Sequence, residues 1–313
     1  MNTPTTISSA DQLAFEELNR RLAVIRDRVR GVAKGHHTGF YLFGRPGTSK
    51  TYTVRNTLDE LGSRYCYHDG HLTPMGLFDL LGEEHDRVIV LDDVSAIFSQ
   101  PVALQLLLAA LGNQPDETGV RIVKYRRQGR DETVRFSGGI ICISNLELHG
   151  NGLLEALKSR VHYLKYDPSD EQMTAMLRMV ASKGWPAGEP LLSPEECWEV
   201  ADYLIDESRR LCVPLDMRHL VDKGLPDYLQ YRSGDAETHW KDLISTTLEE
   251  QLLESQHTET KPRTRKDQKA LEHQIVREIV AWAKTTKEQV AAWEAQTGKS
   301  QRAFYRRLKE VSE

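Results

Sequence analysis

The sequence has few of the features that mark zinc-binding, secreted and membrane proteins. Only 4 of its 313 residues are cysteines, and Cys66, Cys142, Cys197 and Cys212 show no CxxC or other ligand spacing, which argues against a structural zinc site. No run approaches the roughly 18 apolar residues that a membrane span needs. Residues 1–21 lack the basic and then apolar order of a secretory signal. We therefore expect a soluble protein of the reducing cytoplasm, with no membrane partner.

The charge is distributed unevenly along an otherwise ordinary globular composition. Hydrophobic residues make up 39% and charged residues 28%, and the length suits about two domains. From Lys261 to Glu313 there are 13 lysines and arginines against 7 acidic residues, a net charge of +6. Since the total is -5, the remainder of the chain carries -11. The positive C-terminal segment is a candidate nucleic-acid surface.

Strands and helices are predicted to alternate over the first half of the chain. Residues 10–33 have the apolar spacing of an amphipathic helix. The apolar runs GFYLF, RYCYH, RVIVLDD and GGIICISN predict strands, whereas TYTVRNTLDELG and SQPVALQLLLAALG predict helices between them. This order predicts an α/β fold of three layers, in which helices cover both faces of a parallel sheet. Such sheets bind ligands at the carboxyl ends of their strands.

After about Asp167 the predicted strands end and helical patterns follow, at 167–184, 193–210, 215–230 and 237–254. The second pattern opens with a capping box from Ser193 to Glu196, with Pro194 at the first helical position. The next segment has almost no apolar residues and predicts a linker. The predicted parts are an α/β domain at 1–165, an all-helical domain at 166–254, a linker at 255–268 and a small C-terminal helical module at 269–313.

The stretch GRPGTSKT resembles a phosphate-binding loop, G-x-x-x-x-G-K-[ST], except that Ser49 replaces the second glycine. Such loops bind phosphates through backbone N–H groups at the mouth of a helix and through a lysine, here Lys50, while Thr51 would ligate magnesium. Because Ser49 immediately precedes Lys50, we expect it at the helix entry with a right-handed backbone. The alternative is a glycine-rich turn that binds nothing. The predicted ATP-binding residues are Gly44, Arg45, Pro46, Gly47, Thr48, Ser49, Lys50 and Thr51.

A second element strengthens this interpretation. VIVLDD lies about 40 residues downstream, where a sheet of this type would place an acidic strand end. Asp92 would hold magnesium through water, and Asp93 would orient or deprotonate the attacking water. Paired carboxylates at a strand end also occur as helix caps or solvated turns. Together the two elements predict a nucleoside-triphosphate site with ATP and Mg²⁺ as cofactors.

Further residues resemble the AAA+ ATPase family over about residues 35–230. Asn145 lies where that family has sensor 1, Arg160 resembles the arginine finger that completes a neighbouring subunit's site, and Arg218 resembles sensor 2, in the helical lid. The resemblance implies catalytic roles for Asp93, Asn145, Arg160 and Arg218, and a homo-oligomeric ring or spiral, most simply a hexamer. The family usually has glutamate at the position of Asp93. With Ser49 in place of the second glycine, this loop resembles the loops of minichromosome-maintenance helicases, where small residues other than glycine occur at that position.

Residues 120–136 predict a β-hairpin around Gln128 and Gly129, with six basic and two acidic residues. Its position resembles that of the hairpin inserted before sensor 1 in a branch of the family that includes DNA helicases. The alternative is a solvated basic ribbon. Protein-threading members carry an aromatic pore loop, and the corresponding Pro74-Met75-Gly76 lacks the aromatic, which argues against an unfoldase. The candidate DNA contacts in the hairpin are Lys124, Arg126, Arg127 and Arg130.

The C-terminal segment 286–311 resembles a helix-turn-helix. We expect one helix to end near Gln296, a turn at Thr297 and Gly298, and a second helix capped by Ser300. Glu294 departs from the small residue usual in this motif. A plain helical hairpin that helps assembly is the alternative. The apolar residues expected to pack the helices are Val290, Trp293, Phe304 and Leu308, and the candidate DNA contacts are Lys299, Gln301, Arg302, Arg306 and Arg307.

These features favour an ATP-driven AAA+ assembly acting on DNA, in the manner of helicase loaders, transposition regulators or branch-migration motors. A DNA-bound protein partner is a further candidate. The alternatives are a remodeller of a protein complex that uses the C-terminal helices as an adaptor, and an ATP-dependent scaffold that hydrolyses slowly because Asp93 is short.

Overall fold

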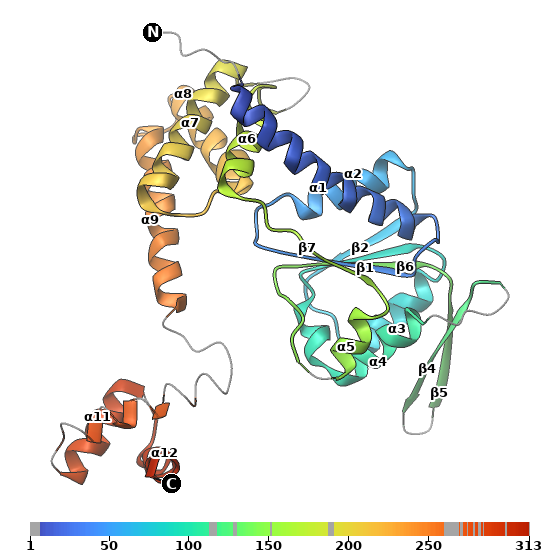
Figure 1. Cartoon of the computed structure of the whole chain (residues 1–313), viewed down its shortest axis with the longest axis vertical. Helices are drawn as coiled ribbons and strands as arrows, with labels where there is room; N and C mark the ends of the chain where they lie inside the picture. Colours follow the sequence, from blue (N-terminus) through green and yellow to red (C-terminus); the bar gives the residue numbers. More distant parts are fainter. Residues whose placement is uncertain are drawn as a thin grey trace. The chain divides into compact units, whose positions relative to one another are not determined.

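The computed structural model contains two compact units, Met1–Ser245 and Thr246–Glu313 (Figure 1). Among the described residues, no helix is both long and apolar enough to cross a membrane. The described residues are 7–112, 118–127, 130–150, 152–186, 191–259, 269, 272–273, 275–277, 279–280, 283, 285–297 and 299–312.

The first unit is built on a five-stranded parallel sheet, which confirms the predicted α/β class. The strand order is β2-β3-β6-β1-β7, and every neighbouring pair is parallel. β1, β3 and β6 are buried at every residue. Their apolar runs predicted this result, because a strand that is covered on both faces has no solvent-facing side. The strands are β1 (Gly39–Phe43), β2 (Tyr65–Asp69), β3 (Val88–Asp92), β6 (Gly139–Ser144) and β7 (His162–Lys165).

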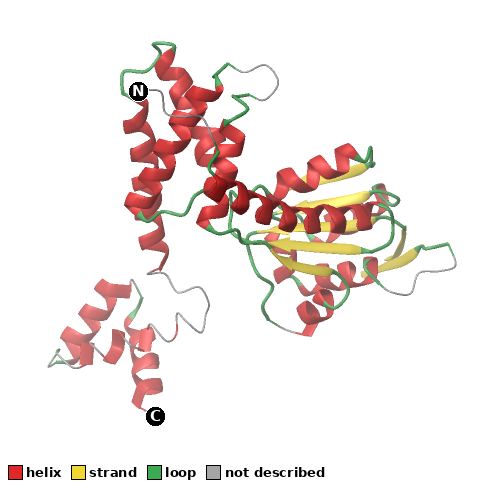
Figure 2. Cartoon of the chain, turned by 45° about the horizontal axis from the view of Figure 1, so that its top comes forward, coloured by secondary structure: helices red, strands yellow, loops and turns green. Residues whose placement is uncertain are grey.

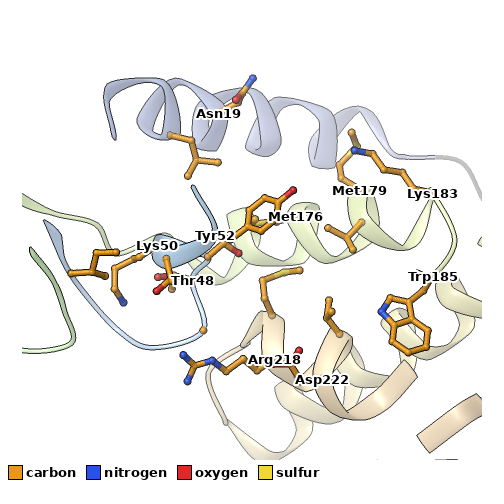
Figure 3. Close-up of a pocket in the computed structure, with 18 of the residues that line it drawn as sticks. Asn19, Thr48, Lys50, Tyr52, Met176, Met179, Lys183, Trp185, Arg218 and Asp222 are labelled. Atoms are coloured by element: carbon orange, nitrogen blue, oxygen red, sulfur yellow. The ribbon is translucent and has the colours of Figure 1, made fainter. Parts of the chain in front are cut away.

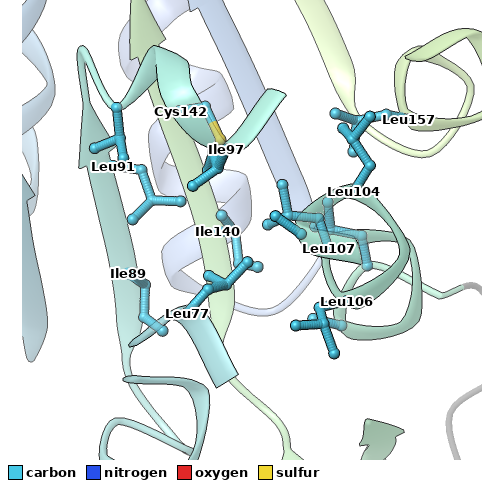
Figure 4. Close-up of a cluster of buried hydrophobic side chains, with 14 of the residues drawn as sticks. Leu77, Ile89, Leu91, Ile97, Leu104, Leu106, Leu107, Ile140, Cys142 and Leu157 are labelled. Atoms are coloured by element: carbon cyan, nitrogen blue, oxygen red, sulfur yellow. The ribbon is translucent and has the colours of Figure 1, made fainter. Parts of the chain in front are cut away.

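Helices cover both faces of this sheet (Figure 1). Alternate residues of β1 point to opposite faces, so Phe40 and Leu42 pack with α1 (Ser9–Ala33) and α2 (Lys50–Glu60), whereas Tyr41 and Phe43 pack on the other side. Figure 4 shows the core on that second face, where leucines of the helices meet strand residues. The helices of the second face are α3 (Pro74–Glu83), α4 (Pro101–Ala110) and α5 (Gly152–Lys158); a short 3-10 turn, η1 (Ser95–Ser99), precedes α4.

The predicted hairpin is confirmed as a separate antiparallel pair, β4 (Arg121–Arg127) and β5 (Arg130–Phe136). Val123 is fully buried and the ring of Tyr125 lies 5.5 Å from that of Phe78 in α3, so one face of the hairpin packs on the first unit. Gln128 and Gly129, the predicted turn, lie outside the described residues.

A helical region follows the sheet, as predicted (Figure 2). The predicted capping box is present at the start of α7 (Pro194–Leu211). The Ser193 hydroxyl accepts from the Glu196 N–H, and the Glu196 carboxylate accepts from the Ser193 N–H. Trp240 is buried between the rings of Tyr203 and Tyr228. The helices are α6 (Asp170–Ala181), α7 (Pro194–Leu211), a π-helical segment η2 (His219–Gly224), α8 (Leu225–Arg232) and α9 (Trp240–Glu259).

Two features differ from the sequence prediction. The third helical pattern contains the π-helical η2, and α9 continues to Glu259, five residues into the predicted linker. The polar stretch from Ser255 contains no glycine or proline before Pro262, the residues that most disfavour a helix, so polarity alone did not mark the helix end. Residues 260–268 lie outside the described part of the chain.

In the second unit, α11 (Thr286–Thr297) and α12 (Gln301–Ser312) form the predicted pair of helices. Trp293 and Phe304 are fully buried with ring centroids 5.8 Å apart, and they share their core with Val276 and Ile279 from the preceding helical residues. Gly298, in the predicted turn, lies outside the described residues.

Candidate functional site

The glycine-rich loop, residues 44–51, joins β1 to α2 at the carboxyl edge of the sheet. Gly47 has a φ of 67°, and a Cβ built there would lie 1.7 Å from Oδ1 of Asp216. The N–H of Met217 donates to the Gly47 carbonyl at 2.9 Å. Glycine at position 47 therefore permits close contact between the loop and the helical region.

The backbone of Ser49 corrects the sequence prediction. Its φ of 64° and ψ of 23° are left-handed, not right-handed, and α2 begins only at Lys50. The loop thus requires here the conformation that glycine would adopt most easily, and serine adopts it at a cost of about 1–2 kcal/mol.

Replacing Ser49 by glycine is expected to raise the free energy of unfolding by about 0.5–1 kcal/mol, because relief of the left-handed backbone outweighs the larger entropy of an unfolded glycine. Ser49→Ala keeps the Cβ and is the matched control, with no gain expected. Urea unfolding of the full chain measures both variants. Equal stability of the glycine and alanine variants would contradict the strain argument.

Lys50 is buried and donates three hydrogen bonds from Nζ: to the Gly44 carbonyl at 2.9 Å, to the Arg45 carbonyl at 2.7 Å and to Asn145 Oδ1 at 3.0 Å. Burial lowers the pKa of Lys50 to about 8, and the neighbouring carboxylates of Asp93 and Asp92 oppose that shift. The ammonium group is therefore held at the loop by three neutral oxygen atoms.

Thr51 and Asp92 lie together, as predicted. The Thr51 hydroxyl donates to Asp92 Oδ2 at 2.6 Å, and the Tyr67 hydroxyl donates to the same oxygen at 2.8 Å. Asp92 is buried and Thr51 is half-buried. Among the described residues no group of three histidine, cysteine or acidic side chains could hold a metal ion, so any cation here would rely on a hydroxyl, one or two carboxylates and its ligand's oxygens.

Asp93 and Asn145 are also brought together. Asn145 donates to Asp93 from Nδ2 at 2.9 Å and from its backbone N–H at 3.2 Å. Asp93 has a φ of 51°, which is uncommon for a residue with a side chain. Because Asn145 also accepts from Lys50, it links the lysine to the second carboxylate.

A cavity of about 730 Å³ opens beside these residues, between the sheet and the helical region of the same unit. Arg218, the predicted sensor 2, lines it, and the backbone N–H of Arg218 donates to Asp216 Oδ1 at 2.7 Å. In Figure 3 Lys50, Thr48 and Arg218 gather at one end and Trp185 lies at the other. The apolar side chains lining the cavity include Phe15, Leu22, Met176, Met179 and Trp185.

Arg160, the predicted arginine finger, is not among the residues that line this cavity. It lies in the turn between α5 and β7, and its guanidinium donates to the Ala156 carbonyl at 2.9 Å.

The hairpin's basic side chains divide into buried and exposed ones. Arg121 is buried, donates to the carbonyl oxygens of Phe136 and Gly138, and stacks over the Phe136 ring. Lys124 and Arg126 are exposed, although Arg126 pairs with Asp131 at 2.5 Å. Among the candidate contacts, the side chains of Arg127 and Arg130 lie outside the described part of the structure.

In the C-terminal unit, two of the candidate DNA contacts are engaged within the protein. Glu272 is buried and pairs with Lys299 at 2.5 Å and with Arg307 at 2.6 Å. Arg307 also pairs with Glu310 at 3.0 Å. The side chains of Gln301, Arg302 and Arg306 are exposed on α12.

Sequence reasoning missed several residues of the site. Tyr67 contacts Asp92 and Asp216 lies against Gly47, and both contacts depend on how distant segments pack together. Much of the apolar wall of the cavity comes from α1 and α6, which are far apart in sequence. Comparison with models of known protein families and with curated protein sequences finds no match to this chain.

Proposed function

We propose that the chain is an ATPase of the AAA+ type, which binds MgATP at the glycine-rich loop, assembles with ATP into a ring or spiral, and acts on DNA. The observation that carries the proposal is the convergence of Lys50, Thr51, Asp92, Asp93 and Asn145 at the carboxyl edge of a parallel sheet, beside a cavity. Ligands bind at this edge in open α/β sheets.

The residues present fit magnesium bound with a triphosphate. Mg²⁺ is usually held by one or two carboxylates together with phosphate oxygens and water, and Thr51 with Asp92 offers a hydroxyl and a carboxylate within 2.6 Å of each other. The bound ion would neutralise charge on the β- and γ-phosphates.

The cavity also fits the two halves of ATP. Its end at Lys50 and Arg218 is cationic, whereas the side chains of Met176, Met179 and Trp185 offer an apolar surface suited to the flat face of a base (Figure 3). With phosphates on the loop, Asp93 would accept a proton from the attacking water while Asn145 orients that carboxylate. Arg160, which lies outside its own chain's cavity, would serve the site of a neighbour.

The affinity for ATP is expected to fall as the pH rises above about 8. The pKa of Lys50 is lowered to about 8 by burial, so the free protein loses this charge above that pH. A bound triphosphate favours the ammonium form of Lys50 and raises its pKa. The affinity for ATP is therefore highest below pH 8, where the free protein already carries this charge, and falls by up to about tenfold per pH unit above pH 8.

Lys50→Arg is the matched control for this pH dependence, because a guanidinium stays charged throughout the range. Fluorescence titration with an ATP analogue from pH 7 to pH 9.5 measures both proteins. The same decline in the lysine and arginine forms would contradict the role of Lys50 titration.

DNA is the proposed target because exposed basic side chains occur both on the hairpin and on α12. Lys124 on β4 and Arg302 and Arg306 on α12 are exposed in the structure. Phosphate contacts dominate affinity for DNA and make it depend on salt. An adaptor role in protein remodelling is the second candidate, favoured by Glu272, which engages Lys299 and Arg307 inside the module.

Removing Arg302 and Arg306 together is expected to weaken DNA binding and to lower the slope of log affinity against log salt by about 2, since each phosphate contact contributes about 0.9. Arg20→Ala, which removes an exposed charge from α1, is the control. Fluorescence anisotropy with labelled duplex and single-stranded DNA, with ATP present, gives the slopes. An unchanged slope, or no binding by the wild type at low salt, would favour the adaptor.

A further inference from the structure

Tyr67 is a residue of the site that neither the phosphate-binding loop nor the acidic strand end predicts. It lies on β2, and its hydroxyl donates to Asp92 Oδ2 at 2.8 Å. The Thr51 hydroxyl donates to the same oxygen at 2.6 Å. Two hydroxyl groups from two different elements thus fix one carboxylate oxygen.

The register of the sheet explains how Tyr67 reaches this carboxylate. β2 pairs with β3 in parallel so that Tyr67 is opposite Val90, two residues before Asp92. Side chains two residues apart on a strand point to the same face, and both Val90 and the ring of Tyr67 pack in the core under α1 and α2. The phenol therefore leans along the strand toward the carboxyl edge, where α2 brings Thr51.

The ring of Tyr67 is itself held in place. The guanidinium of Arg55, on α2, lies 4.8 Å from the ring centroid, a distance suited to a cation–π contact. The ring contact with Arg55 and the hydrogen bond to Asp92 together fix the position of the Tyr67 hydroxyl.

We propose that Tyr67 is a positioning residue that orients Asp92 for magnesium, an inference that rests on the proposed MgATP site. Thr51 would ligate the ion through an oxygen lone pair while its O–H still donates to Asp92, so Tyr67 would be the second donor that keeps this carboxylate oriented when both residues hold the ion. Hydrogen-bond partners of metal ligands typically contribute 10–100-fold to metal affinity. Tyr67 is not among the residues that line the cavity.

Tyr67→Phe removes only the hydroxyl and keeps the ring under Arg55. The probe is a fluorescent, non-hydrolysable ATP analogue, titrated first in EDTA and then at a series of Mg²⁺ concentrations. We expect affinity in EDTA to stay within about twofold, and the Mg²⁺ concentration that gives half of the affinity gain to rise about tenfold.

Tyr65→Phe is the matched control, because Tyr65 lies on the same strand and its hydroxyl donates to Asp59 Oδ1 at 2.9 Å, away from Asp92. This variant should show the wild-type Mg²⁺ dependence. Unchanged Mg²⁺ dependence in Tyr67→Phe would overturn the proposal, and so would an equal loss of affinity with and without Mg²⁺, which is the result of a merely structural role. A wild-type chain that binds no nucleotide in either condition would overturn the ATP site as well, and is thus a distinct result.

Discussion

Lys50→Met is expected to lower the affinity for ATP by at least about 100-fold. The Nζ of Lys50 is held by two loop carbonyls and by Asn145, in the position from which it would reach the β- and γ-phosphates. Charge-assisted hydrogen bonds contribute about 1.5–3 kcal/mol each, and two of them correspond to about two orders of magnitude in affinity. Methionine fills a similar volume, so the fold should persist.

Isothermal titration with ATP and Mg²⁺ measures this effect directly. Lys34→Met, at the exposed C-terminal end of α1, removes the same charge from the same unit and is the control. An affinity of the Lys50 variant within threefold of the control would show that the triphosphate does not bind at this loop.

Arg160→Ala is expected to reduce ATP turnover by about 10³-fold or more while ATP affinity stays close to that of the wild type. The γ-phosphoryl group carries negative charge in the transition state, and an arginine from a neighbouring chain stabilises it only after assembly. Arg160 lies in the turn after α5, outside its own chain's cavity, as a residue acting on a neighbour must.

Mixing variants separates a neighbour's arginine from one acting within its own chain. Chains with Arg160→Ala keep an intact loop, and chains with Lys50→Met keep an intact arginine, so mixed assemblies should recover part of the activity that neither variant has alone. Arg64→Ala, which removes an exposed arginine paired with Asp86, is the control. Turnover unaffected by Arg160→Ala, or no recovery on mixing, would contradict the role of Arg160.

Sequence was sufficient for the elements with strong local signals. The strand runs around Phe40 and Ile141 are largely apolar because the sheet is covered on both faces. Asp92 ends β3 and Asn145 directly follows β6, so both were readily placed at the carboxyl edge. The capping box at Ser193 was predictable for the same reason: it depends on residues three positions apart.

The missed elements had weaker local signals. α3 begins with Thr73 as its cap and Pro74 in its first turn, in the stretch that was compared with a pore loop because it follows the second strand. β7 has four residues and forms only by pairing with β1. Such short strands depend on their partner, which a periodic pattern cannot specify.

Side-chain partners were the least predictable part of the site. The left-handed Ser49 is imposed by the loop as a whole, and Tyr67 meets Asp92 through the register of β2 on β3. Lys299 and Arg307 were predicted as candidate DNA contacts, whereas the structure pairs both with Glu272, which precedes them by 27 and 35 residues. Local sequence carries no signal for pairs at such separations.

Sedimentation velocity of the full chain, with and without a non-hydrolysable ATP analogue and Mg²⁺, measures whether a triphosphate at the glycine-rich loop joins neighbouring protomers. We expect a shift from the 35.7 kDa monomer to a closed or spiral oligomer when the analogue is present, and no shift for Lys50→Met. A wild-type chain that remains monomeric at saturating analogue would contradict this expectation.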